Sequence, residues 1–352
     1  MPTRTAKSTP HSPTCLSWTT CLSWTICLGL VLTLLLLPAS ADAQSNPDFY
    51  LAPNGVTVLC PEAEVGDTGT VDGTPYTKRD RAGLDALKEA DENNPAFATT
   101  CTSGLEDMSR MFVLAESFDQ DLSGWDVSNV TTMRRMFFGA ASFNQPLEGW
   151  DVSNVTTMRQ MFAGAASFNQ PLEGWDVSNV TTMRDMFIDA DAFNQPLESW
   201  DVSNVTTMRQ MFAGAASFNQ PLEGWDVSNV TTMSYMFMDA DAFNQPLEGW
   251  DVSNVTTMSY MFYRAESFDQ DLSSWDVTSV TDSFGRFLDG SGMSPVNYDA
   301  LLIGWAALDL QDNLTLGADS VRYTPGAADA RQSIIDDYGW TINDSGLAAS
   351  SR

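Results

Sequence analysis

The feature that most constrains this chain is a tryptophan that recurs every 25 residues. It stands at positions 125, 150, 175, 200, 225, 250 and 275, within a unit of the form FNQPLEGWDVSNVTTMRQMFAGAAS. Seven such units cover residues 108–287. A fixed period of this length is typical of folds in which each repeat is one coil stacked on the next. We therefore expect the middle of the chain to be a stack of coils.

The apolar residues within one unit predict its local structure. Met158, Met161 and Phe162 are spaced as on one face of a short helix. Trp150 and Val152 alternate with a polar residue, as in a strand that is buried on one side. The predicted coil is therefore a strand, a turn, a short helix and a return, and the array is an α/β repeat solenoid.

One unit alone cannot bury enough apolar surface to offset the backbone entropy that it loses on folding. Stacking is required, because each coil then shares its apolar faces with two neighbours. In the last unit Ser283 and Arg286 stand where the other units have methionine, while Phe287 persists. Such a loss of the repeat pattern is expected where a stack of coils meets a cap.

The segment before the array, residues 44–107, is predicted to be an N-terminal cap. Asp72 and Gly73 have the composition of a two-residue hairpin turn. A short helix is expected near residues 80–90.

The segment after the array, residues 288–343, is predicted to be a C-terminal α/β cap. Ser294-Pro295 and the later Thr-Pro pair at 324–325 each have the pattern of a helix N-cap followed by proline. Residues 344–352 are expected to be a disordered tail.

The N-terminal segment, residues 1–43, has the pattern of a secretory signal peptide. Its apolar run of 12 residues, Ile26 to Leu37, is too short to cross a bilayer, which needs about 20 residues. Small residues that permit cleavage after Ala41 or Ala43 follow the run. The mature chain is therefore expected to be secreted or held at the cell surface, with no transmembrane segment.

Export limits the chemistry that remains. Cleavage would remove His11, the one histidine, and leave Cys60 and Cys101 as the cysteines. Histidine-dependent catalytic triads and dyads and the usual zinc sites then lack their parts. In an oxidising compartment two remaining cysteines usually pair, so a Cys60–Cys101 disulfide is predicted.

The charge balance excludes two classes of partner. The chain has 46 acidic and 17 basic side chains and a formal net charge of −29. Such a surface repels nucleic acid and anionic lipid headgroups.

The unit WDVSNVTTMxxMFxGAxSFNQ closely resembles the bacterial surface protein repeat of BspA-type leucine-rich-repeat proteins. The resemblance extends to the flanks, from YLAPNGVTVLC before the array to NYDALLIGWAAL and YGWTIND after it. It implies a right-handed leucine-rich-repeat-like solenoid displayed outside the cell. Adhesion or protein binding is the function that it implies.

An aspartate recurs beside each tryptophan, so stacking would place like charges close together and something must offset their repulsion. One explanation is that each carboxylate accepts backbone N–H groups in its own DVSN turn. The other is that calcium or sodium ions lie along the column. The residues concerned are Asp126, Asp151, Asp176, Asp201, Asp226, Asp251 and Asp276.

Variation among the units of this one chain indicates a binding surface. The LEGWDVSN segment hardly changes, whereas the residues that flank the predicted helix do. Tyrosine and arginine are enriched at binding hot spots. The candidate binding residues are therefore Arg134, Arg135, Tyr235, Tyr260 and Tyr263. The alternative is that exposed helix positions drift without consequence.

Catalysis is not expected. An enzyme would have to use carboxylates alone, as glycan hydrolases do, and no acid–base pair is unique among the repeated units. The expected partner is a protein or another cell-surface macromolecule, with no cofactor, and the oligomeric state stays open. A structural component of an envelope or matrix is the alternative function, and a carboxylate-based glycan hydrolase is a more remote one.

Overall fold

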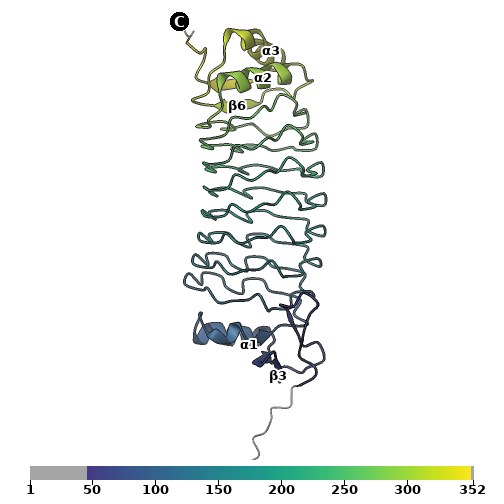
Figure 1. Ribbon diagram of the computed structural model, residues 1–352. Coiled ribbons are helices and arrows are strands. Elements are labelled where there is room, and N and C mark those ends of the chain that lie inside the picture. The colour runs from purple at the N-terminus through teal and green to yellow at the C-terminus, as the bar shows by residue number, and fades with distance from the viewer. Residues whose placement is uncertain (1–45, 350–352) are drawn as a thin grey trace, which may run out of the picture. The chain divides into compact units, whose positions relative to one another are not determined.

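The computed structural model describes residues 46–349, which belong to one compact unit. The expected signal peptide, residues 1–43, lies outside the described residues. Between the two caps the chain runs in coils that stack on one another (Figure 1). Within residues 46–349, no helix has both the length and the apolar character needed to cross a membrane.

The N-terminal cap is built from short strands and one helix. Its elements are β1 (Tyr50–Leu51), β2 (Val58–Leu59), β3 (Thr68–Val71), β4 (Thr74–Lys78), α1 (Arg81–Ala90), the 3-10 turn η1 (Pro95–Phe97) and β5 (Thr100–Cys101). β1 and β2 are antiparallel, and β4 pairs antiparallel with β3 and parallel with β5. Asp72 and Gly73 join β3 to β4 with φ of 48° and 82°, so the predicted hairpin turn is confirmed.

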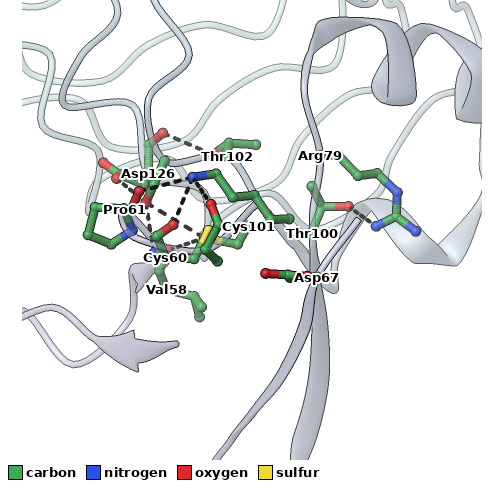
Figure 2. Close-up of a disulfide and its surroundings, with 12 residues drawn as sticks. Val58, Cys60, Pro61, Asp67, Arg79, Thr100, Cys101, Thr102 and Asp126 are labelled. Carbon is green, nitrogen blue, oxygen red and sulfur yellow. Dashed lines mark hydrogen bonds between the residues drawn. A yellow bond between two sulfur atoms is a disulfide. The ribbon is translucent and has the colours of Figure 1, made fainter. Parts of the chain in front are cut away.

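The predicted disulfide is present in this cap. Cys60 and Cys101 are bonded, with their Cα atoms 6.3 Å apart (Figure 2). The ammonium group of Lys78 donates to the carbonyl oxygens of Cys60, Pro61 and Ala63 at 3.0, 3.1 and 2.8 Å. The disulfide and the lysine together hold a loop that has little regular structure.

The segment expected to be a short helix in each coil is a run of turns instead. Its methionine and phenylalanine side chains are buried as predicted. The N–H groups of Met133 and Arg135 donate to Thr157 O and Arg159 O of the next coil, at 3.2 and 3.0 Å. The N–H of Met136, the residue after Arg135, closes a turn onto Met133 O at 3.1 Å. A helix would need these donors for bonds within the segment.

The backbone conformation also explains why this segment is not a helix. Arg135 and Gly139 have φ of 59° and 68°, and the corresponding residues of other coils are also left-handed. A left-handed residue at every fourth position interrupts a right-handed helix. The burial spacing of a helix therefore arises here from successive turns.

The strand expected at the tryptophan is also absent. The N–H of Trp150 bonds to Leu147 O at 3.1 Å, and the N–H of Val155 bonds to Val152 O at 2.9 Å. These turns leave no extended segment between them. The parallel pairing lies further on, at single threonine bridges such as Thr132–Thr157. The coil is thus made of turns and isolated bridges, which corrects the strand–turn–short-helix prediction.

Identical side chains stack along the array and form its core. Phe137, Phe162 and Phe187 follow one another with ring centroids 5.5 and 5.6 Å apart. The indole rings of Trp175 and Trp200 are parallel at 6.5 Å and 3% exposed. Every coil therefore buries its aromatic rings against those of the coils on both sides.

The last coil contains one additional residue, which corrects the alignment made from sequence. The N–H of Tyr235 bonds to Ser259 O, whereas the N–H of Tyr260 bonds to Gly285 O, one residue further along. The buried methionine position is therefore filled by Phe284 and not by Ser283, and Arg286 takes the place of a tyrosine. The core persists to the end of the array instead of fading.

The C-terminal cap consists of α2 (Pro295–Ala306), β6 (Thr315–Ala318), the 3-10 turn η2 (Pro325–Ala327), α3 (Ala328–Tyr338) and β7 (Thr341–Asp344). Ser294 caps α2 as predicted, while Thr324 caps η2, after which α3 begins. β6 and β7 are parallel. Residues 344–348 are not a free tail, because Asp344 belongs to β7 and Leu347 bridges Tyr323.

Both caps continue the hydrogen-bond ladders of the coils. Within the array each indole N–H donates to a leucine carbonyl, as Trp200 does to Leu172 O at 2.9 Å. At the N-terminal end the acceptor for Trp125 is the carbonyl of Phe97, at 2.9 Å. At the other end Trp305 of α2 serves as the donor. The caps satisfy polar groups that the terminal coils would otherwise expose.

Candidate functional site

The surface that varies among coils lies on the turn segment described above. We call its variable side chains, most of which are half-buried, the corner face. Its first position follows the first methionine of the coil, at residues 134, 159, 184, 209, 234 and 259. Its second position is the next residue, with Arg286 in the last coil, and its outer position follows the phenylalanine, at residues 138, 163, 188, 213, 238 and 263.

The structure brings three of the predicted binding residues together. The rings of Tyr235 and Tyr260 stack with centroids 4.6 Å apart, and Tyr263 lies 5.6 Å from Tyr260. The guanidinium of Arg209 lies over Tyr235 at 5.1 Å, and that of Arg286 lies 5.8 Å from Tyr260. These five side chains form one cluster, which we call the tyrosine column. Arginine over an aromatic face is a favourable cation–π arrangement.

The other two predicted residues lie four coils away. Arg135 packs over Phe138 at 5.3 Å and donates from Nε to Gln160 Oε1 at 2.7 Å. Arg134 is half-buried beside it. The predicted binding residues therefore share one face but not one site.

Sequence reasoning missed the arginines between these two groups. Arg159, Arg184 and Arg209 follow Arg134 at the first corner position, one in each coil. Asp185 is buried among them, with its Oδ2 3.2 Å from Arg184 Nε and 3.9 Å from Arg159 Nε. A count of charges would have found them, because all eight basic residues of the array lie in this segment: Arg110, Arg134, Arg135, Arg159, Arg184, Arg209, Arg264 and Arg286.

Two hollows lie on the corner face. One, of about 340 Å³, is lined by Tyr263, Arg264, Arg286 and Asp289 together with residues 290 and 319. The other, of about 220 Å³, lies among Phe138, Gln160, Ile188, Asp189 and the small residues between them. The first is polar and adjoins the tyrosine column, so it offers charged groups next to half-buried aromatic rings.

The aspartate column is explained by its own turns. Asp176 accepts the N–H of Ser178 at 3.1 Å and its hydroxyl at 2.6 Å. The other six aspartates accept the N–H two residues on in the same way. Among the residues that the structure describes, no three His, Cys, Asp or Glu side chains form a group able to hold a metal ion.

These hydrogen bonds change the titration of the column. The hydroxyl and N–H of Ser178 stabilise the charged carboxylate and lower the pKa of Asp176 below its usual value, and the pKa values of Asp201 and Asp251 are lowered for the same reason. On the corner face the pKa values of two aspartates are shifted in the opposite direction. Partial desolvation of the carboxyl raises the pKa of Asp189, which lies at the surface, and, despite Arg264 nearby, that of Asp239.

Replacing Asp176, Asp201 and Asp251 with asparagine should weaken the acid sensitivity of the fold. A carboxyl whose pKa is lowered on folding contributes stability above its unfolded pKa, about 3.9, and this contribution is lost as the pH falls through the folded value. Asparagine keeps the oxygen acceptor of the turn but does not titrate. Thermal melts between about pH 5 and pH 2 should show a smaller fall for the triple variant. An unchanged fall would contradict the prediction.

These features define a class, namely a repeat protein whose stacked coils display one variable face. The chain belongs to the family described as Mycoplasma protein of unknown function, DUF285, whose model matches residues 85–199 and 189–296. The matches run from α1 through the coils into α2. No curated protein and no solved structure was found to match the chain.

Proposed function

We propose that this chain is an exported, BspA-type surface protein with a right-handed leucine-rich-repeat-like solenoid. In this proposal it binds a protein or another cell-surface macromolecule through its corner face and catalyses no reaction. The repeat sequence and the coil-on-coil packing support the class. The corner face supports the binding role, because the rest of each coil is nearly constant along the chain.

The observation that carries the proposal is the kind of residue found at the second corner position. Its backbone is left-handed in coil after coil, with φ of 63° at Tyr235 and 60° at Tyr260. This conformation costs a side-chain-bearing residue about 1–2 kcal/mol, and glycine or asparagine would lower that cost. The chain nevertheless places large side chains there in all but one coil, where the buried Asp185 takes the position: Arg110, Arg135, Gln160, Gln210, Tyr235, Tyr260 and Arg286. A binding role for these side chains accounts for their presence despite the backbone cost.

Replacing the tyrosines of the column should abolish attachment to cells. The full chain carries Tyr235→Asn, Tyr260→Asn and Tyr263→Ser, since asparagine tolerates the left-handed backbone. Aromatic hot-spot residues contribute enough affinity that their joint loss should weaken binding at least tenfold. The measurement is the binding isotherm of the labelled protein on a panel of animal and bacterial cells.

A matched control carries three substitutions away from the corner face, at the exposed threonines Thr231→Ser and Thr256→Ser of the same two coils and Thr206→Ser of the coil before them. This variant should bind as the unaltered chain does. Equal binding by the tyrosine variant and the control would overturn the proposed placement of the site. Fractionation of cells that express the tagged full chain tests export independently, and retention in the cytoplasm would contradict it.

A further inference from the structure

We propose that the arginines of the first corner position bind a linear acidic polysaccharide with one carboxylate on each sugar. The residues are Arg134, Arg159, Arg184 and Arg209, which we call the arginine column. The inference rests on the proposed function in that it takes the corner face to be a binding face, and it names the partner. The two columns share Arg209, which lies over Tyr235, and otherwise occupy different coils of that face.

The column concentrates positive charge that the protein itself does not neutralise. Asp185 is the acidic side chain that pairs with it, through Arg184 and Arg159. No terminal guanidinium nitrogen of the four arginines makes a hydrogen bond within residues 46–349, and the Nε atoms of Arg134, Arg159 and Arg209 are buried without an acceptor. Arginines on neighbouring coils repel one another. An anionic ligand would relieve this repulsion and accept the N–H groups of the terminal guanidinium nitrogens.

The net charge of −29 does not prevent this contact. At physiological ionic strength charges farther than about 8 Å are largely screened, so a ligand on the column interacts mainly with its immediate surroundings. Apart from Asp185, the acidic groups of the same coils on this face are Asp189 and Asp191, both exposed. Along the column itself the positive charges predominate.

The spacing of the column decides between a polysaccharide and an acidic peptide. Coils paired through parallel bridges lie about 4.8 Å apart, so the arginines repeat at this interval. An extended peptide presents side chains on one face every 6.6 to 6.8 Å or so, since each residue advances about 3.3–3.4 Å. Its carboxylates would lose register within two coils. In a two-fold polyuronate chain the carboxylates on one face recur at every second sugar. This spacing is close to that of two coils, so these carboxylates can stay opposite every second arginine.

The backbone of the coils leads to the same choice. The N–H groups of the corner segment donate to the next coil or close turns, as those of Gln160 and Met161 do. A peptide could not add to these groups as a further strand, and its own amides would lie against side chains that are mostly donors. Carboxylates and hydroxyls of a polysaccharide supply the acceptors that the column lacks.

The test measures binding of the full chain to polygalacturonate over a series of salt concentrations. Fully methyl-esterified polygalacturonate, which has the same backbone without charge, and poly-glutamate are the comparison ligands. The unaltered chain should bind polygalacturonate with an affinity that falls as salt rises. Its affinity for each comparison ligand should be at least tenfold lower.

Two variants with opposite expected effects make the test specific. Arg134→Gln with Arg159→Gln, which leaves Arg209 and the tyrosine column intact, should bind polygalacturonate at least tenfold more weakly and with a smaller salt dependence. Arg184 is kept, because its loss would leave Asp185 without its nearest partner. D185N removes the negative charge of the column and should bind more tightly.

The matched control is Arg79→Gln with Arg322→Gln, which removes the same charge outside the coils and should bind as the unaltered chain does. Equal binding by the two double variants would overturn the inference. So would poly-glutamate bound as tightly as polygalacturonate. If polygalacturonate is not bound while cells still are, this inference is wrong and the proposed function stands.

Discussion

Removing residues 170–194 should leave a folded protein, whereas removing only residues 170–181 should abolish cooperative folding. The longer deletion takes out one whole coil and joins Asn169 to Gln195, which restores the natural sequence at the junction. Every ladder then continues, because its bonds join equivalent residues of adjacent coils. Marginal stability of about 0.05–0.15 kcal/mol per residue predicts a loss of about 1–4 kcal/mol.

The shorter deletion removes half a coil and leaves a fragment that cannot close. The buried methionines of one coil would then face the tryptophan side of the next, and the stack would be interrupted. Urea unfolding followed by circular dichroism distinguishes the outcomes, with size-exclusion chromatography to detect expanded species. A half-coil deletion that unfolds as cooperatively as the whole-coil deletion would refute the view that stability comes from coil-on-coil register.

Substituting Trp200 with alanine should lower the free energy of unfolding by about 3–5 kcal/mol. The indole is buried against Trp175, and its N–H donates to Leu172 O at 2.9 Å. Truncation leaves a cavity between two coils and deprives a buried carbonyl of its donor.

Trp200→Phe is the informative comparison, because it keeps most of the apolar contact and loses the hydrogen bond. It should cost less than the alanine variant. Thr206→Ala, at an exposed position, controls for substitution as such and should change stability by about 0.5 kcal/mol or less. Midpoints of urea unfolding, measured with an unchanged slope, give the differences. A loss below that of the threonine control would show that the tryptophan ladder does not hold the array together.

The repeat, its burial pattern and its caps could be predicted from sequence because each depends on local chemistry. The apolar side chains of every coil are those assigned to the core, and Asp72-Gly73 and Ser294 act as their residue types dictate. The secondary structure within the coil could not be predicted in this way. A spacing that buries Met158 and Met161 suits a helix and a run of turns equally. The choice is made by bonds to the next coil, which a single repeat does not encode.

The candidate site was predictable only in part, for a related reason. Tyr235, Tyr260 and Tyr263 stand out as unusual residues in a varying segment, and the structure brings them together. The arginine column lacks such a signal in any one coil, because its charge matters only when four coils lie in register. The additional residue of the last coil shifts the alignment of the repeats by one position. Sequence alone therefore did not place Arg286 at the tyrosine position, where it joins the cluster in the folded chain.

The two ends of the stack are not equally secured. The Cys60–Cys101 bond ties down the cap at one end, whereas the chain beyond Cys101 contains no cysteine and its cap is held by packing and hydrogen bonds. In a one-dimensional array melting proceeds from the weaker terminus. The chain should therefore unfold first at the α2–α3 end, so amide protons near Tyr260 and Tyr263 exchange sooner than those near Arg134 and Arg159. A protease should accordingly cleave the coils next to the α2–α3 cap before the coils that carry Arg134 and Arg159.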